Sequence, residues 1–311
     1  MTAPGSEAFV EAALLRFGVV ADRSGPEFES RSGAGVHPVR TSAGSTAFLK
    51  VTPAGLGTGA IDGACRELRF YTDIAHLAPV RTPRLLDWVR LDEGVALLLE
   101  AAGRPVPVER WTAEMWSALG RDLAALHAMD VPAASRRPAP DPLGSALADP
   151  DLDVIRAFWQ PVLPNLDDLL ARLAHLERDL DALPAALVHG DCHTDNIVHR
   201  SGRQVFCDWQ VTGVGRPASD LAMLRVRATP AGVDVPDALL DAYSASAGHP
   251  RRAVERAVLA AEVAIFVLQW PPFAAYNTPA GIDRVHRRTR SIADGWLSDV
   301  TRIGFGGKYP V

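Results

Sequence analysis

The chain has 311 residues, of which 48% are hydrophobic, and a formal net charge of −5 at pH 7. This length allows two lobes with a substantial core, and nothing in the charge points to nucleic acid as a dedicated partner. No apolar run is long enough to span a bilayer, so no membrane partner is expected. Three cysteines without metal-type spacing, and an N-terminus without a basic leader, predict a reducing cytoplasm as the location.

The N-terminal third contains two turns of small residues and an apolar run around Lys50. The turns lie at 31–36 (RSGAGV) and 42–45 (SAGS), and the run STAFLKVT follows, so the pattern predicts two successive hairpins. Lys50 is conspicuous because the only other lysine is Lys308. Pro38 would remove a hydrogen-bond donor from a central strand, which leaves the strand pairing around it open.

Helical periodicity follows in residues 63–77 (GACRELRFYTDIAHL), where Leu68, Tyr71 and Ile74 form an apolar stripe. Glu67 lies beside that stripe and can point toward a sheet. A buried lysine needs an acidic partner, which this glutamate could supply. The alternative interpretation is an ordinary solvated glutamate on a helix surface.

Apolar patterns also predict the next elements. Residues 95–100 (VALLLE) indicate a buried strand that enters a loop, and residues 116–132 indicate a strongly amphipathic helix. We interpret His127, near the end of that helix, as a structural histidine. Residues 132–150 are rich in Pro, Ala, Ser and Asp and predict a loop, after which further helices are expected.

The run LVHGDCHTDNIV at 187–198 says most about function. Asp191 and Asn196 lie in a polar turn between apolar residues that predict strands. Phosphoryl transfer needs a carboxylate that accepts the proton of an attacking hydroxyl, and a neutral oxygen ligand that holds magnesium without competing for that proton. Asp208 ends the strand-like run VFCD and suits a second magnesium ligand. The sequence therefore predicts that Asp191 is catalytic and that Asn196 and Asp208 bind the metal.

Two cysteines and a histidine near this run suggest a comparison with zinc sites. Cys192, His193 and Cys207 have a spacing that matches no common zinc cluster. We interpret the cysteines as small buried residues, so no metal ligation by thiolate is predicted.

The chain closely resembles the aminoglycoside phosphotransferase family and its relatives among choline and other small-molecule kinases. The resemblance rests on His-Gly-Asp, four residues and Asn at 189–196, then a strand ending in Asp-Trp at 208–209, then GVGRPASDLAML at 213–224. It implies an α+β, two-lobed, protein-kinase-like fold. Residues 1–100 would form an antiparallel-sheet, nucleotide-binding lobe, and residues 101–311 a mainly helical lobe for catalysis and acceptor binding.

In the N-terminal lobe, the resemblance implies that the turn from Gly33 to Gly35 closes over the nucleotide phosphates. Glycine would let backbone amides approach phosphate oxygens, although an ordinary hairpin turn explains these residues as well. Lys50 would reach the α and β phosphates, and Glu67 would pair with Lys50.

The resemblance also implies roles around the lobe boundary and the catalytic loop. The backbone of the loop at Glu100, Ala101 and Gly103 would form the hinge that binds the base, which leaves ATP versus GTP open because backbone recognition leaves little sequence trace. His189 would hold the catalytic loop by hydrogen bonds, and Asp220 would brace it. At the start of a helix, Asp220 could also be an N-terminal carboxylate and nothing more.

The acceptor is the hardest question for the sequence. A pocket for a polycation should be lined by carboxylates, whereas the C-terminal run RVHRRTR at 284–290 is rich in arginine and Gln210 replaces a residue that is often acidic in relatives. This argues against a highly cationic acceptor. Trp270, Phe273 and Tyr276 could line a site for a sugar, nucleoside or macrolide-like face, or could equally be core packing.

We therefore expect a cytoplasmic kinase that transfers the γ-phosphoryl of ATP or GTP, with Mg²⁺, to a hydroxyl of a small molecule. The first choice of acceptor is an antibiotic or related secondary metabolite, in resistance or biosynthesis. The alternatives are a housekeeping kinase for an amino alcohol or sugar, and a catalytically silent nucleotide-binding relative. The presence of Lys50, Asp191, Asn196 and Asp208 argues against silence.

Overall fold

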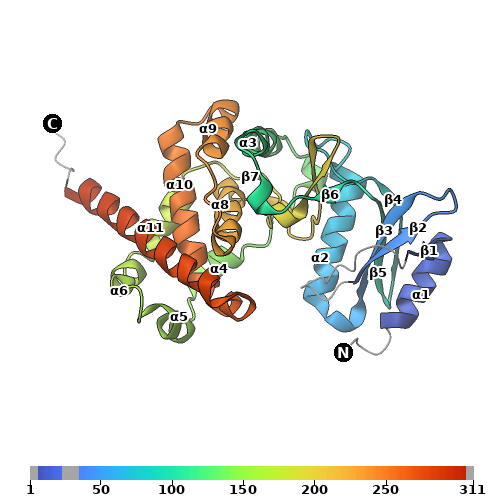
Figure 1. Cartoon of the computed structure of the whole chain (residues 1–311), viewed down its shortest axis with the longest axis horizontal. Coiled ribbons are helices and arrows are strands. Elements are labelled where there is room, and N and C mark those ends of the chain that lie inside the picture. Colours follow the sequence, from blue (N-terminus) through green and yellow to red (C-terminus); the bar gives the residue numbers. More distant parts are fainter. Residues whose placement is uncertain (1–5, 23–34, 306–311) are drawn as a thin grey trace. The chain divides into compact units, whose positions relative to one another are not determined.

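The computed structural model describes residues 6–22 and 35–305. The chain divides into two compact units, and each unit is made of segments that are not contiguous in the sequence (Figure 1). The first comprises Met1–Pro105, Asp130–Arg136 and Asn196–Thr212, and the second Val106–Met129, Arg137–Asp195 and Gly213–Val311. The chain therefore returns to the first unit at Asn196, within the predicted catalytic run (residues 187–198), and the returning segment also carries Asp208.

The first unit is built on a five-stranded antiparallel sheet in the order β1-β2-β3-β5-β4. The strands are β1 (Val20–Ala21), β2 (Gly35–Arg40), β3 (Thr46–Pro53), β4 (Leu85–Leu91) and β5 (Gly94–Glu100). The predicted hairpin at 42–45 joins β2 to β3, where Gly44 adopts the positive φ of 77° that the turn requires. Pairing continues through Pro38, which lies opposite Phe48.

Pro38 is tolerated in β2 because of the direction in which its backbone points. Its carbonyl accepts a hydrogen bond from the amide of Asp22, on the side away from β3. The nitrogen and carbonyl of one strand residue face the same neighbour, so the ladder to β3 loses no donor.

Alternation along the strands gives the sheet two different faces. Leu49 and Val51 point to the face covered by α1 (Ser6–Phe17), where they join a core with Phe9 and Ala13. Lys50, one position along, points to the opposite face, which α2 (Thr58–Arg69) contacts through β3 and β5. A lysine in an apolar strand is thus directed toward the helix that carries Glu67.

A second, three-stranded sheet completes the first unit with β6 (Arg104–Pro105), β8 (Ile197–Arg200) and β9 (Arg203–Phe206). The β8–β9 hairpin turns at Ser201 and Gly202, both with positive φ, as a tight two-residue turn requires. Ile197 pairs with Phe206, and the carbonyl of Asn196 accepts from the amide of Cys207. The hairpin therefore brings Asn196 next to the residue that precedes Asp208.

The second unit is mainly helical, with one small antiparallel sheet of β7 (Ala186–Val188) and β10 (Gly213–Gly215). Gly120 lets α3 (Ala113–His127) pack closely on α9 (Ala238–Ala247), because a Cβ there would lie 2.3 Å from the carbonyl oxygen of Leu239. The helices are α3 (Ala113–His127), α4 (Pro142–Ala148), α5 (Leu152–Trp159), α6 (Leu166–Leu170), α7 (Leu173–Leu180), α8 (Pro217–Ala228), α9 (Ala238–Ala247), α10 (Arg251–Ala264) and α11 (Pro279–Phe305). Across both units, the short 3₁₀ or π segments are η1 (Ala54–Leu56), η2 (Phe70–Ile74), η3 (Val108–Arg110), η4 (Ala133–Ser135), η5 (Thr194–Asn196), η6 (Thr229–Ala231), η7 (Ile265–Gln269) and η8 (Pro271–Tyr276).

These elements confirm the predicted antiparallel-sheet N-terminal part and mainly helical C-terminal part. The prediction of a plain loop at 132–150 was wrong, because α4 lies within it. Asp141 caps that helix by accepting from the amide of Gly144, and Pro142 occupies the first turn, where its missing N–H costs nothing. None of the helices in the described ranges combines the length and the apolar character that a membrane crossing needs.

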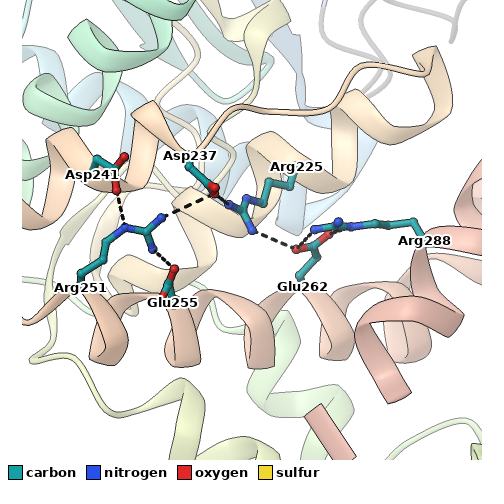
Figure 2. Close-up of polar contacts among 7 residues, drawn as sticks. All are labelled: Arg225, Asp237, Asp241, Arg251, Glu255, Glu262 and Arg288. Atoms are coloured by element: carbon teal, nitrogen blue, oxygen red, sulfur yellow. Dashed lines mark hydrogen bonds and ion pairs between the residues drawn. The ribbon is translucent and has the colours of Figure 1, made fainter. Parts of the chain in front are cut away.

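A buried carboxylate ties three helices of the second unit together (Figure 2). Glu262, at the end of α10, has no exposed surface. Arg288 of α11 donates to both of its oxygens, at 2.6 and 3.0 Å, and Arg225 of α8 lies 3.7 Å away. Arg251 continues the network at its rim, where it contacts more exposed acids.

Replacement of Glu262 should destabilise the protein. In Glu262→Gln two partly buried guanidinium groups lose their shared anion, and the free energy of unfolding should fall by roughly 3 kcal/mol, the lower end of the range for breaking a buried pair because Arg288 still reaches water. Urea unfolding measures the change. Glu255→Gln is the control, since the exposed pair of Glu255 with Arg251 should contribute less than about 1 kcal/mol. Equal effects of the two variants would contradict a central role for Glu262.

Candidate active site

The ammonium of Lys50 lies between two carboxylates of the first unit. Its Nζ is 2.7 Å from Oε2 of Glu67 and 2.9 Å from Oδ1 of Asp208. The side chains of Lys50 and Glu67 are 8% and 1% exposed, whereas that of Asp208 is 40% exposed. The structure therefore brings three residues that the sequence singled out into direct contact, and it leaves one of the carboxylates open to solvent.

Electrostatics keep this lysine charged despite its burial. Burial by itself lowers the pKa of Lys50, but the charges and hydrogen bonds of Glu67 and Asp208 outweigh burial and the net shift is upward. Burial also raises the pKa of Glu67, which the Lys50 ammonium opposes. The charged lysine thus depends on its two acidic neighbours.

A pocket in the first unit opens above these charged groups. Lys50, Glu67 and Asp208 form its polar end, and the other walls are mostly apolar. The remaining lining residues are Val36, Phe48, Tyr71, Pro83, Leu99, Glu100, Ala102, Gly103, Val198 and Cys207. A flat apolar group can be held between such walls while its charged extension reaches the lysine.

Part of the loop that the sequence analysis expects to be the hinge lines this pocket. Glu100 lines the pocket, and its carboxylate contacts Arg84 at 3.3 Å and also Arg200. Ala101, expected beside it, is not among the described lining residues, whereas Ala102 and Gly103 are. Gly103 belongs to the loop predicted as the hinge, whereas the sequence analysis did not single out Ala102.

The expectation that Gly33 to Gly35 form a turn over the nucleotide phosphates is wrong for Gly35. Gly33 lies outside the described residues. Gly35 does not lie in a turn: it starts β2 and pairs with Val51. Its lack of a side chain makes room for His37, because a Cβ on Gly35 would lie 2.4 Å from Nε2 of that imidazole.

The catalytic run begins at the end of β7 in the second unit and is held by Asp220 of α8. The backbone amides of His189 and Gly190 donate to the two oxygens of Asp220, at 2.7 and 2.8 Å. Nε2 of His127 lies 3.2 Å from Asp220, and its Nδ1 lies 3.0 Å from the hydroxyl of Tyr243. His127 was predicted to be a structural histidine, but its contact with Asp220 joins residues 93 positions apart and could not be inferred from the sequence.

Asp191 is part of a row of alternating charges. Oδ2 of Asp191 lies 3.5 Å from Nε2 of His193, whose Nδ1 lies 3.5 Å from Asp195, and Arg227 of α8 contacts Asp195 at 3.3 Å. Burial raises the pKa of Asp191, but His193 outweighs burial, with smaller contributions from His189 and Arg227, and lowers the pKa to about 2.

His193 and Arg227 had no place in the site predicted from the sequence. Burial lowers the pKa of His193, but hydrogen bonds to Asp191 and Asp195 outweigh it and the net shift is upward. The signal was present as two acidic residues on either side of His193 at two-residue spacing. The part played by Arg227 required the fold.

The aromatic residues considered for the acceptor do not form one cluster. Trp270 is 5% exposed and packs on Phe158, with ring centroids 5.6 Å apart, so it belongs to the core. Phe273 and Tyr276 are 45% and 72% exposed on η8. Trp270 lies between η7 and η8, and α5, which carries Phe158, contacts both segments.

The arginines at 284–290 are largely engaged within the second unit. Arg284 donates to the carbonyl of Pro230 at 2.7 Å, Arg290 donates to the carbonyl of Val162, and Arg288 binds Glu262. Their charges therefore give no support to the predicted repulsion of a cationic acceptor.

The thiols of Cys192 and Cys207, which adjoin Asp191 and Asp208 in the sequence, are not activated as nucleophiles. Burial is the main cause that raises the pKa of Cys192 well above its ordinary value and that of Cys207 to about 12. Within 6–22 and 35–305, no three acidic, histidine or cysteine side chains converge on a point that could hold a metal ion by themselves. A divalent cation at Asn196 and Asp208 would need further oxygen ligands from a bound molecule or water.

A sequence model of the phosphotransferase enzyme family matches residues 34–255. The chain belongs to this family. The match includes Lys50, the catalytic run and Asp220, which confirms the resemblance drawn from the motifs. The chain is thus a small-molecule kinase. No curated protein sequence matches it.

Solved structures of phosphotransferases share the fold. Amicoumacin kinase hAmiN, solved with AMP-PNP, Ca²⁺ and Ami, is 14% identical with a TM-score of 0.58 and 93% coverage of both chains. A macrolide 2'-phosphotransferase type I is 20% identical, with a TM-score of 0.56 and coverage of 92% of this chain and 97% of that one. A choline/ethanolamine kinase family protein from Mesorhizobium loti is 18% identical, with a TM-score of 0.58 and coverage of 91% and 94%. At these identities the similarity shows the protein-kinase-like fold alone, and it confirms the predicted fold class.

The charge row around His193 predicts that one contribution to stability is confined to a pH window. The pKa of Asp191 lies below its ordinary 3.8, so this residue stabilises the fold above that value and the effect is lost as the pH falls toward 2. The pKa of His193 is raised, so its contribution is complete below its ordinary 6.5 and is lost as the pH rises through the folded-state pKa.

His193→Asn should therefore lower the free energy of unfolding most between about pH 4 and about pH 6.5. The loss should be about 1 kcal/mol or less, because Asp191 is partly exposed to solvent. Urea unfolding at a series of pH values measures it, with His175→Asn, an exposed histidine of α7, as the control. A His193 effect that is constant with pH would rule out the charge row as its source.

Proposed function

We propose that this family member transfers the γ-phosphoryl group of ATP or GTP, with Mg²⁺, to a hydroxyl of an antibiotic or related secondary metabolite. The observation that carries the proposal is the buried Lys50 ammonium between Glu67 and Asp208 at the polar end of an apolar pocket. Such an arrangement suits a nucleotide, which has a flat base at one end and anionic phosphates at the other.

The pocket supports a specific orientation of the nucleotide. The base would lie between the apolar walls near Phe48, Leu99 and Val198, next to the backbone of residues 100–103. The phosphates would extend toward Lys50. An ammonium has three N–H donors, so two can remain with the carboxylates while the third turns to a phosphate oxygen.

The donor atoms of Asn196 and Asp208 fit a magnesium ion. Both supply oxygen, the ligand that this hard cation prefers, and the β8–β9 hairpin holds both residues at its open end. The partial exposure of Asp208 leaves its carboxylate accessible to a ligand. When bound with the nucleotide, magnesium would neutralise charge on the transferred phosphoryl group.

Asp191 would accept the proton of the acceptor hydroxyl. A carboxylate with a pKa of about 2 is a weak base, which suits a transition state in which the hydroxyl is oriented first and loses its proton late. Asp220 would keep Asp191 in place through the amides of His189 and Gly190. Phe273 and Tyr276 are the exposed aromatic candidates for contact with the acceptor.

A second candidate is a kinase for an amino alcohol or sugar. It is favoured by structural similarity to the choline/ethanolamine kinase family protein, which equals the similarity to amicoumacin kinase in TM-score. Since Arg284, Arg288 and Arg290 are held by partners within the second unit, the arginine-rich run does not exclude a cationic acceptor such as an amino alcohol.

An acceptor screen tests the proposal. The wild-type protein should consume nucleotide with one or more hydroxylated antibiotics or metabolites, and mass spectrometry should detect the added phosphate. Asp191→Asn should lower kcat by about 10² to 10⁴ while nucleotide affinity stays nearly unchanged, because the carboxylate acts on the acceptor. More than about a tenth of wild-type kcat in this variant would remove Asp191 from the role of base.

Metal binding is tested by nucleotide affinity. Asp208→Asn should lose most of the magnesium-dependent gain in affinity, whereas Asn196→Ala should lose less, because a charged oxygen contributes more to a hard dication than an amide oxygen does. Asparagine is chosen at 208 because the native φ of 63° is one that asparagine adopts readily. Titration calorimetry with and without Mg²⁺ gives both gains. An unchanged magnesium-dependent gain in nucleotide affinity in Asp208→Asn would contradict the assignment of Asp208 as a metal ligand.

A further inference from the structure

One face of α2 and its continuation carries a set of contacts to the segment that follows Asp208. Gly63, Arg66, Glu67 and Phe70 occupy positions i, i+3, i+4 and i+7, so they lie on the same side of the helix. Glu67 of this set contacts Lys50. The other three contact the segment from Asp208 to Gln210, which belongs to the same unit.

The contact of Phe70 is an aromatic stack. Its ring lies parallel to the indole of Trp209, with centroids 3.8 Å apart and an interplanar angle of 10°, and both side chains have no exposed surface. The indole nitrogen of Trp209 donates to the carbonyl of Phe206 at 3.0 Å. The residue directly after Asp208 is thus fixed from two sides.

Arg66 and Gly63 hold the next residue. Nη1 of Arg66 donates to the backbone carbonyl of Gln210 at 2.7 Å. Gly63 provides the space: a Cβ there would already lie 3.6 Å from the Cβ of Gln210, in ordinary contact, so a longer side chain would push the segment away. Neither contact depends on the terminal amide of the Gln210 side chain, so the segment is held mainly through its backbone.

These contacts surround a residue with an unfavourable backbone conformation. Asp208 has a φ of 63°, in the left-handed region, which costs free energy for a residue other than glycine and persists only where neighbours over-determine it. In that conformation its carboxylate reaches the Lys50 ammonium. The contacts that hold Trp209 and Gln210 can therefore keep Asp208 in this conformation.

We infer that Arg66 and Phe70, with space provided by Gly63, are positioning residues that hold Asp208 for metal binding and couple the placement of α2 to it. One helix face then sets both partners of Lys50: Glu67 directly, and Asp208 through the backbone of Trp209 and Gln210. The inference rests on the proposed function, in which Asp208 is a magnesium ligand.

Calorimetric titration of ATP, in Mg²⁺ and in EDTA, tests the inference in wild type, Arg66→Met and Phe70→Leu. Both variants should lose about tenfold of the magnesium-dependent gain in affinity, the lower end of the range for residues that orient a metal ligand. Affinity in EDTA should stay within about twofold, because the pocket walls are untouched. Arg69→Met is the matched control, since Arg69 is exposed on the same helix.

The outcomes separate the inference from the proposed function. A wild-type protein without any magnesium-dependent gain would overturn the proposed function, and the inference with it. A wild-type gain that Arg66→Met retains within about twofold, as Arg69→Met does, would overturn the inference alone. Loss of affinity in EDTA together with a lower Tm in Arg66→Met would show a general structural role for Arg66, which would also overturn the inference. Arg66→Met keeps the test decisive if the core variant Phe70→Leu does not fold.

Discussion

The buried ammonium of Lys50 is the constraint on which the first unit depends. A buried charge in the centre of a sheet is tolerable only with anionic partners at hydrogen-bonding distance, and Glu67 and Asp208 supply them from a helix and from the end of a distant hairpin. This requirement explains why a segment at 196–212 returns to a unit formed mostly by the first hundred residues. It also explains why Asp208 is held in a strained backbone conformation.

The second unit solves a related problem for the catalytic run. Asp220 binds two consecutive backbone amides, which leaves the loop little freedom. The side chain of His127 also contacts this carboxylate, and the other ring nitrogen of His127 contacts the hydroxyl of Tyr243. The same helix contributes Arg225 to the Glu262 network and Arg227 to the charge row around Asp191. Helix α8 thus connects the packing of the helical unit with the electrostatics of Asp191.

Local chemistry made several features predictable. The small-residue turn at 42–45, the strand of Lys50 and the polar run at 187–198 follow from turn preference and alternation over a few residues, which are properties of neighbouring positions. Other expectations failed where long-range packing decides. The arginine-rich run was expected to repel a cationic acceptor, but Arg284, Arg288 and Arg290 bind carbonyl and carboxylate partners that lie far away in the sequence. For Trp270 the sequence left core packing and an acceptor site open, and the contact with Phe158 decides for the core. The helix at 142–148 was missed because the Pro-, Ala-, Ser- and Asp-rich composition of 132–150 predicted a loop, and Asp141 was not recognised as a helix N-cap.

The sequence by itself determined the family, the order of sheet and helical parts, and the residue types capable of phosphoryl transfer, because each depends on motifs and periods readable over about a dozen positions. Only the tertiary structure decided which residues meet. It joined Lys50 to Asp208 across 158 positions and placed Trp209 on Phe70, and it joined His127 to Asp220 within the other unit. The physical reason is that such contacts depend on the paths of whole strands and helices, which no local pattern encodes.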